Sequence, residues 1–139
     1  MHMALRRAAA WQAGVMARLT QIVVDCHHPA GLGRFWAPAL DEFEVRAYDE
    51  AEITRLAALG FTPETDPVVI LDGPGLEICF QKVDPPPVAK RPLHLDMRSD
   101  DRAREVARLM DLGASVVEEF ETHSWMRDPE GNDFCIVDV

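Results

Sequence analysis

The sequence predicts an α+β fold built from two related modules, each with the order strand–helix–strand–strand–strand. Strand-like and helix-like segments follow one another in the same order on either side of the proline run at 84–87. A matching turn, Asp72-Gly73 in the first half and Glu130-Gly131 in the second, precedes the last strand-like segment. The chain of 139 residues, 47% hydrophobic and 27% charged, is long enough to bury a sizeable core without disulfides.

The first half supplies a strand, a helix and three further strands, with one additional helix. Residues 19–26 (LTQIVVDC) are apolar and β-branched, which favours a strand. Pro29 suits the first turn of a helix, and apolar residues recur at helical spacing up to Leu40. The later segments are predicted as a strand at 43–48, a helix at 49–59, and strands at 67–71 and 76–83.

The second half, 92–139, repeats this order after a linker at 84–91. It is predicted to contain a strand at 92–97, a helix from Asp100 or Asp101 to Gly113, and strands at 114–121, 124–127 and 133–139. Gln21 and His94 occupy matching places 73 residues apart, whereas the matching turns are 58 residues apart. The difference places an insertion of about 15 residues in the first half, at the helix 49–60.

Charge separates residues 1–18 from the rest of the chain. The net charge is −10, but residues 1–24 contain three arginines and no acid, so the remainder has 11 basic and 24 acidic residues. An acidic protein is a poor match for nucleic acid, which is bound through clustered Lys and Arg. Residues 1–18 lack the apolar run of a secretory signal, so we expect a cytoplasmic protein without a membrane anchor. They suit a transit-like segment, a peripheral helix, or translated sequence upstream of a start at Met16.

The alternation of side chains along the strands predicts a polar face on each sheet. Leu76, Ile78 and Phe80 form a hydrophobic set that should face the helices, so Glu77 and its neighbours should face the other way. The same reasoning predicts an opposite, pocket-lining face that holds Gln21, Glu77, His94, Asp96 and Cys135. The three cysteines, Cys26, Cys79 and Cys135, are widely spaced and are expected to be reduced.

Three segments resemble the glyoxalase-like domains of the vicinal oxygen chelate superfamily. They are HPAGLGRFW (28–36), RPLHLDMRSDD (91–101) and WMRDPEGNDFCIV (125–137). The superfamily includes glyoxalase I, extradiol dioxygenases, and fosfomycin- and bleomycin-resistance proteins, and the resemblance covers residues 19–139. It implies two βαβββ modules whose mixed sheets curve around a shared pocket, and a homodimer.

The resemblance also implies a divalent metal, for example Zn, Ni, Mn or Fe, with one ligand on each of four strands. The matching positions are Gln21, Glu77, His94 and Cys135. Cys135 stands where metal-dependent relatives usually have Glu; as a thiolate it would suit zinc, and as a neutral thiol it would only fill space. His94 bonded to Asp96 and a solvated Glu77 would explain the same residues without a metal.

Two functions remain open on the sequence alone. The first is a small-molecule enzyme of the lyase, isomerase or dioxygenase type, with Glu77 or Asp96 as the base and a small oxygen-rich substrate. The second is a non-catalytic protein that sequesters a small molecule, as the bleomycin-resistance branch does. In either case we expect Trp125, Gln81 and Cys135 to contact the ligand.

Overall fold

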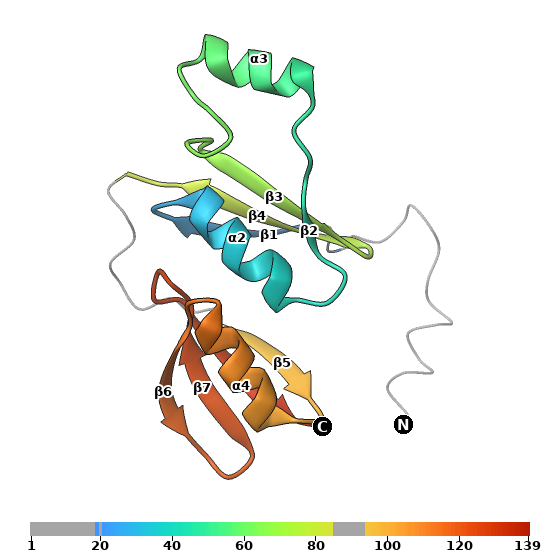
Figure 1. The fold of residues 1–139 in the computed structure, drawn as a ribbon, viewed down its shortest axis with the longest axis vertical. Helices are drawn as coiled ribbons and strands as arrows, with labels where there is room; N and C mark the ends of the chain where they lie inside the picture. The colour runs from blue at the N-terminus through green and yellow to red at the C-terminus, as the bar shows by residue number, and fades with distance from the viewer. Residues whose placement is uncertain (1–18, 20, 85–93) are drawn as a thin grey trace.

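The computed structural model describes residues 19, 21–84 and 94–139, so the extension 1–18 and most of the linker 84–91 lie outside the described residues. The described part folds into two modules of four strands each (Figure 1). The elements are β1 (Gln21–Cys26), α2 (Pro29–Ala39), β2 (Glu44–Val45), α3 (Glu50–Ala58), β3 (Val68–Gly73), β4 (Leu76–Lys82), β5 (Leu95–Ser99), α4 (Arg102–Asp111), β6 (Ser115–Glu119), β7 (His123–Arg127) and β8 (Asp133–Asp138).

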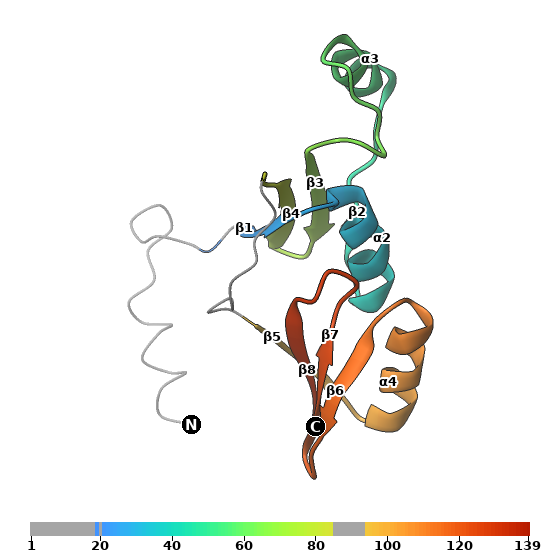
Figure 2. The ribbon, with the colours of Figure 1, turned by 90° about the vertical axis from the view of Figure 1, so that its left-hand side faces the viewer.

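The strand order is the same in both modules. Sheet A has the order β1-β4-β3-β2 and sheet B the order β5-β8-β7-β6. The first and last strands of each module are parallel, and the other pairs are antiparallel. The helices α2 and α4 cover the same side of the two sheets (Figure 2), which leaves an open face on the other side of each sheet. The predicted α+β fold of two βαβββ modules is confirmed.

Several boundaries differ from those that the sequence predicts. Strand β2 contains two residues rather than the predicted 43–48, because the chain leaves sheet A after Arg46, whose backbone N–H still donates to Ile70. Strand β3 continues to Gly73, so the turn consists of Pro74 and Gly75. The predicted strand at 92–97 is observed from Leu95 to Ser99.

One hydrophobic core joins the two modules. Ile78 and Phe80 are 5% and 1% exposed and face α2, as their alternation predicts. The ring of Trp36 on α2 packs edge-on against Phe134 on β8, with 5.1 Å between the ring centroids. Burial of aromatic side chains is among the largest contributions to stability, so this contact ties α2 to the second module.

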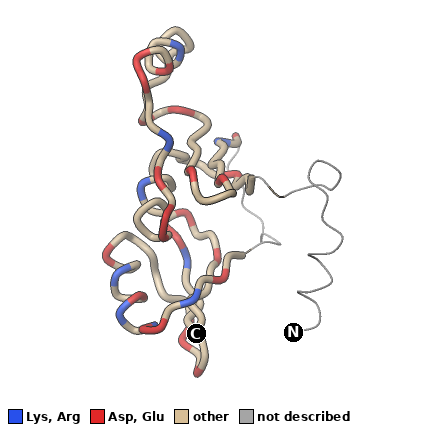
Figure 3. Tube along the Cα trace, turned by 90° about the vertical axis from the view of Figure 1, so that its right-hand side faces the viewer, with Lys and Arg blue, Asp and Glu red and all other residues tan. Residues whose placement is uncertain are grey.

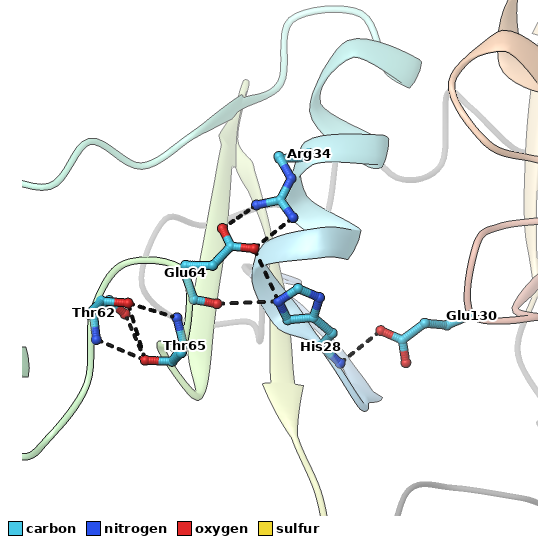
Figure 4. Close-up of polar contacts among 6 residues, drawn as sticks. All are labelled: His28, Arg34, Thr62, Glu64, Thr65 and Glu130. Carbon is cyan, nitrogen blue, oxygen red and sulfur yellow. Dashed lines mark hydrogen bonds and ion pairs between the residues drawn. The ribbon is translucent and has the colours of Figure 1, made fainter.

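Polar contacts from the second module hold both ends of α2. His28, the residue before the helix, makes no side-chain cap, and its backbone N–H donates instead to one oxygen of Glu130 (Figure 4). The backbone N–H of His27 donates to the other oxygen of Glu130. At the other end, the guanidinium of Arg108 donates to the carbonyls of Pro38 and Ala39. An acidic group near the N-terminus of a helix and a cationic group near its C-terminus both interact favourably with the helix dipole.

The inserted helix α3 stands away from the two sheets at one end of the molecule (Figures 1 and 2). Asp49 caps it by accepting a hydrogen bond from the backbone N–H of Glu52. Leu56 is the only residue of α3 that is buried, and the phenol of Tyr48 donates to Asp66 below the helix. The helix is therefore attached to sheet A through a small contact area.

Charged side chains are distributed over both modules (Figure 3). No helix in the described part of the chain is long and apolar enough to cross a membrane.

Candidate functional site

The open face of sheet A carries a four-residue polar network. The Gln21 side chain donates to one oxygen of Glu77 at 2.9 Å, and Arg46 donates to the other at 2.6 Å. Arg46 also donates to both oxygens of Asp72. These hydrogen bonds hold the pKa of the Asp72 carboxyl below, and that of the Arg46 guanidinium above, their ordinary values. The predicted neighbours Gln21 and Glu77 are thus brought together, but both oxygens of Glu77 are engaged.

The open face of sheet B carries a second row of candidate residues. The register of the strands places Asp96, Cys135 and Trp125 side by side on β5, β8 and β7. The His94 Nε2 atom lies 3.4 Å from the Asp96 carboxylate, and both side chains are more than half exposed. Burial, and then the negative charges of Asp96 and Asp133, raise the pKa of the Cys135 thiol. Cys135 is therefore a neutral thiol at neutral pH.

Asp133 is a site residue that the sequence analysis does not single out. Its carboxylate accepts hydrogen bonds from the Trp125 indole at 2.9 Å and from the Arg127 side chain at 3.1 Å. Burial would raise its pKa, but these hydrogen bonds, together with the charges of Arg127 and His94, outweigh burial and lower it. Asp133 is therefore ionised at neutral pH and fixes the position of the Trp125 ring.

The strand register shows how Asp133 relates to the first module. In sheet A, Gln21 on β1 lies opposite Glu77 on β4. In sheet B, the first registered pair of β5 and β8 is Leu95 with Phe134, and the residues directly before this pair are His94 and Asp133. His94 and Asp133 therefore correspond to Gln21 and Glu77. The counterpart of Glu77 is therefore Asp133, and the counterpart of Cys135 is Cys79. The signal that could have revealed this is the glycine: Gly75 and Gly131 both have positive φ, at 73° and 82°, so Gly131 matches Gly75 rather than Gly73.

The side chains as arranged in one chain do not fit a divalent metal. Among the residues that the structure describes, no three or more His, Cys, Asp and Glu side chains gather closely enough to hold an ion. Gln21 and Glu77 lie on sheet A, whereas His94 lies beside sheet B. In addition, Gln21 and Arg46 already donate hydrogen bonds to both oxygens of Glu77.

The remaining predicted ligand contact, Gln81, lies apart from the other candidates. It pairs with Asp25 on β1 and with Val68 on β3, near the end of sheet A, and its side chain is exposed. No contact in the described part of the chain joins it to the row on sheet B. Cys79, which neighbours it on β4, is buried, and burial raises the pKa of this thiol too. Cys79 and Cys135 are free thiols.

An apolar cavity of about 480 Å³ lies between the two modules. The edge strands β1 and β5 both contribute to it, together with the turn that precedes β8. Of the site residues predicted from the sequence, His94 alone lines this cavity. The lining otherwise includes Ile22, Val24, Trp36, Ile78, Phe80, Leu95 and three aspartates.

Comparison with known proteins supports the resemblance that the motifs suggest. The structure is similar to a glyoxalase/bleomycin resistance protein/dioxygenase family enzyme from Burkholderia phytofirmans PsJN, with 15% identity, a TM-score of 0.63, and coverage of 88% of this chain and 99% of that one. It is also similar to the trypanothione-dependent glyoxalase I of Leishmania major, with 17% identity, a TM-score of 0.60, and coverage of 88% and 87%.

A third similar structure is a glyoxalase family protein from Bacillus cereus, with 16% identity, a TM-score of 0.56, and coverage of 93% of this chain and 98% of that one. At these identities the likeness establishes the fold. No curated protein matches the sequence. The sequence model of the glyoxalase-like domain matches residues 21–137, which is most of the chain. The chain therefore belongs to the glyoxalase-like domain family of the vicinal oxygen chelate superfamily.

Proposed function

We propose that this chain is a glyoxalase-like enzyme that moves a proton on a small oxygen-rich molecule bound at the open face of sheet B. The observation that carries the proposal is the pairing of His94 with Asp96, 3.4 Å apart and exposed to solvent, beside Trp125 and Cys135. A carboxylate and an imidazole in contact are a suitable pair for general acid–base catalysis. The indole of Trp125, with the Arg127 guanidinium 5.5 Å from its centroid, provides a flat surface for a planar ligand.

In this proposal Asp96 is the base and His94 is its partner. An oxygen of Asp96 accepts the proton from the substrate, and the His94 ring donates a hydrogen bond to the substrate oxygen on which negative charge develops. Glu77 is the weaker candidate for the base, because Gln21 and Arg46 already donate to both of its oxygens. The neutral thiol of Cys135 lies between Asp96 and Trp125 and contributes surface to the site. The arrangement requires no metal ion.

The second candidate function is binding without turnover, and Asp133 favours it. This carboxylate fixes the Trp125 ring through the indole N–H, which prepares a stacking surface before any ligand arrives. A protein that sequesters a planar molecule needs such a surface, and it needs no base. We also expect a homodimer from the family resemblance, which light scattering on the purified protein would measure.

The substitutions Asp96→Asn and His94→Ala separate these two functions. Native mass spectrometry of the purified protein, followed by a screen of 2-oxoaldehyde–thiol adducts and catechols, would provide a ligand. The enzyme proposal expects each substitution to lower kcat by a factor of about 10² or more. Asp111→Asn, an exposed acid at the end of α4, is the matched control. Turnover that survives both substitutions excludes the proposed base, and binding without any turnover favours sequestration.

A further inference from the structure

The cavity between β1 and β5 has the size and the lining of a binding site. Its volume of about 480 Å³ lies within the usual range for small-molecule sites, about 300–1,000 Å³. Ile22 and Val24 of β1 form one wall, Leu95 of β5 forms another, and Trp36, Ile78 and Phe80 complete the apolar surface. Strand β1 lies at the edge of sheet A, and the cavity extends past this edge to Val23 and Asp25. The helices therefore do not close the cavity.

Most of the polar residues around the cavity are aspartates. Asp25, Asp128, Asp133, Asn132 and His94 line it, and neither Lys nor Arg is found among its lining residues in the described part of the chain. Among these described lining residues, a ligand anion would therefore meet three carboxylates and neither Lys nor Arg. A ligand with hydrogen-bond donors or a positive charge would meet the carboxylate acceptors of these aspartates.

The three aspartates differ in whether their charge is compensated. Asp128 is buried and accepts hydrogen bonds from Trp36, from Asn132 and from backbone N–H groups. Asp133 is paired with Arg127. The Asp25 carboxylate, in contrast, has no hydrogen bond or ion pair with any residue that the structure describes. Asp25 is therefore the group that a cation in this cavity would neutralise.

We propose that this cavity is a second binding site, which takes a small molecule with an apolar, preferably aromatic, body and an ammonium head group. The body lies against Ile22, Val24 and Leu95, and the head group lies at Asp25. The proposed site borders the enzyme site on sheet B through His94 and Asp133, but it does not rest on the proposed reaction, because neither Asp96 nor Trp125 lines the cavity.

The experiment uses benzyltrimethylammonium as the probe and the full chain as the protein. Titration calorimetry should show binding of this cation and no binding of benzenesulfonate, which has a similar body and the opposite charge. Asp25→Asn should weaken cation binding about tenfold, which is a loss of about 1.4 kcal/mol in the free energy of binding. Asp111→Asn, which removes an equal charge far from the cavity, should leave the affinity unchanged.

A second measurement tests the position of the ligand body. The probe should shift the NMR methyl signals of Val24 and Leu95 and leave those of Val116 on β6 unaffected. Val24→Phe, which fills part of the cavity, should abolish binding; a circular dichroism spectrum and an unfolding curve show whether this variant is folded. Binding of benzenesulfonate as tightly as of the cation, unchanged affinity in Asp25→Asn, or the absence of any binding overturns the proposal. Loss of turnover in Asp96→Asn with cation binding intact would leave this site standing.

Discussion

The indole N–H of Trp36 donates to the carboxylate of Asp128 at 2.9 Å, and both side chains are buried. The two residues are 92 positions apart and belong to different modules. The same carboxylate accepts hydrogen bonds from the backbone N–H groups of Glu130 and Asn132 and from the Asn132 side chain. Asp128 thus shapes the turn before β8 and attaches that turn to α2.

Replacement of Asp128 by Ala should be among the most destabilising single changes in this protein. It leaves the Trp36 N–H and the donors of the turn without their acceptor in a buried place. The expected loss is about 2–4 kcal/mol in the free energy of unfolding, measured by urea denaturation. Glu121→Ala, which removes an exposed acid without side-chain contacts among the described residues, should change stability by less than about 0.5 kcal/mol. Equal midpoints for the two variants would contradict the role assigned to Asp128.

Glu130 replaces the missing local cap of α2, so its substitution should loosen the start of this helix. Glu130→Gln keeps the shape of the side chain but removes the charge that faces the helix N-terminus. We expect a loss of about 0.5–2 kcal/mol and faster amide hydrogen exchange in the first turn of α2. Glu121→Gln, which alters an exposed acidic residue, is the control. Unchanged exchange at the start of α2 would show that Glu130 is not the cap.

The lowered pKa of Asp133 predicts a pH dependence of stability. Because this carboxyl has a lower pKa in the folded than in the unfolded protein, it stabilises the fold above the unfolded pKa of about 3.9. That contribution is lost as the pH falls through the folded pKa. The difference in unfolding free energy between the wild type and Asp133→Asn should therefore be largest near neutral pH and shrink in acid. A carbon-detected NMR titration should also show that Trp125→Phe raises the pKa of Asp133.

The raised pKa of Cys135 predicts slow alkylation at neutral pH. Iodoacetamide reacts with the thiolate, so the rate at Cys135 should rise only as the pH passes above the ordinary thiol pKa. Asp96→Asn removes a neighbouring negative charge and should move the midpoint to lower pH, whereas Asp111→Asn should not. Peptide mass spectrometry separates the product from those of Cys26 and Cys79, which are buried. Rapid alkylation of wild-type Cys135 at pH 7 would contradict the predicted pKa.

Local pattern predicts most of the fold, whereas the contacts of the candidate site residues depend on how strands and modules meet. Alternation correctly places Ile78 and Phe80 of β4 in the core, although Cys79 on the opposite face is buried as well. The additional helix of the first module was located by comparing the two halves. Both are short-range properties of a chain. The limits of β2 were wrong because they depend on where α3 takes the chain away from sheet A. Contacts such as Trp36 with Asp128 depend on how two modules meet, which no local pattern records.

The same limit applies to individual site residues. The turn motif directed attention to Cys135, whereas the strand register makes Asp133 the counterpart of Glu77. Asp133 and Cys135 are two residues apart on β8 and therefore lie on the same face of the sheet. Alternation alone could not decide which of the two corresponds to Glu77. The engagement of Glu77 by Arg46 was likewise hidden, because Arg46 directly follows β2, which is not adjacent to β4 in sheet A.

The way in which α2 is held bears on the history of the two modules. Its first turn depends on Glu130, its middle on Asp128 and its last turn on Arg108, and all three belong to the second module. Among the residues that the structure describes, no corresponding set from the first module holds α4, whose own Asp101 caps it. If the two halves arose from one ancestral unit that folded alone, the helix α2 of the first copy has since come to depend on contacts from the second copy. Of the two matching helices α2 and α4, only α4 is capped by a residue of its own module.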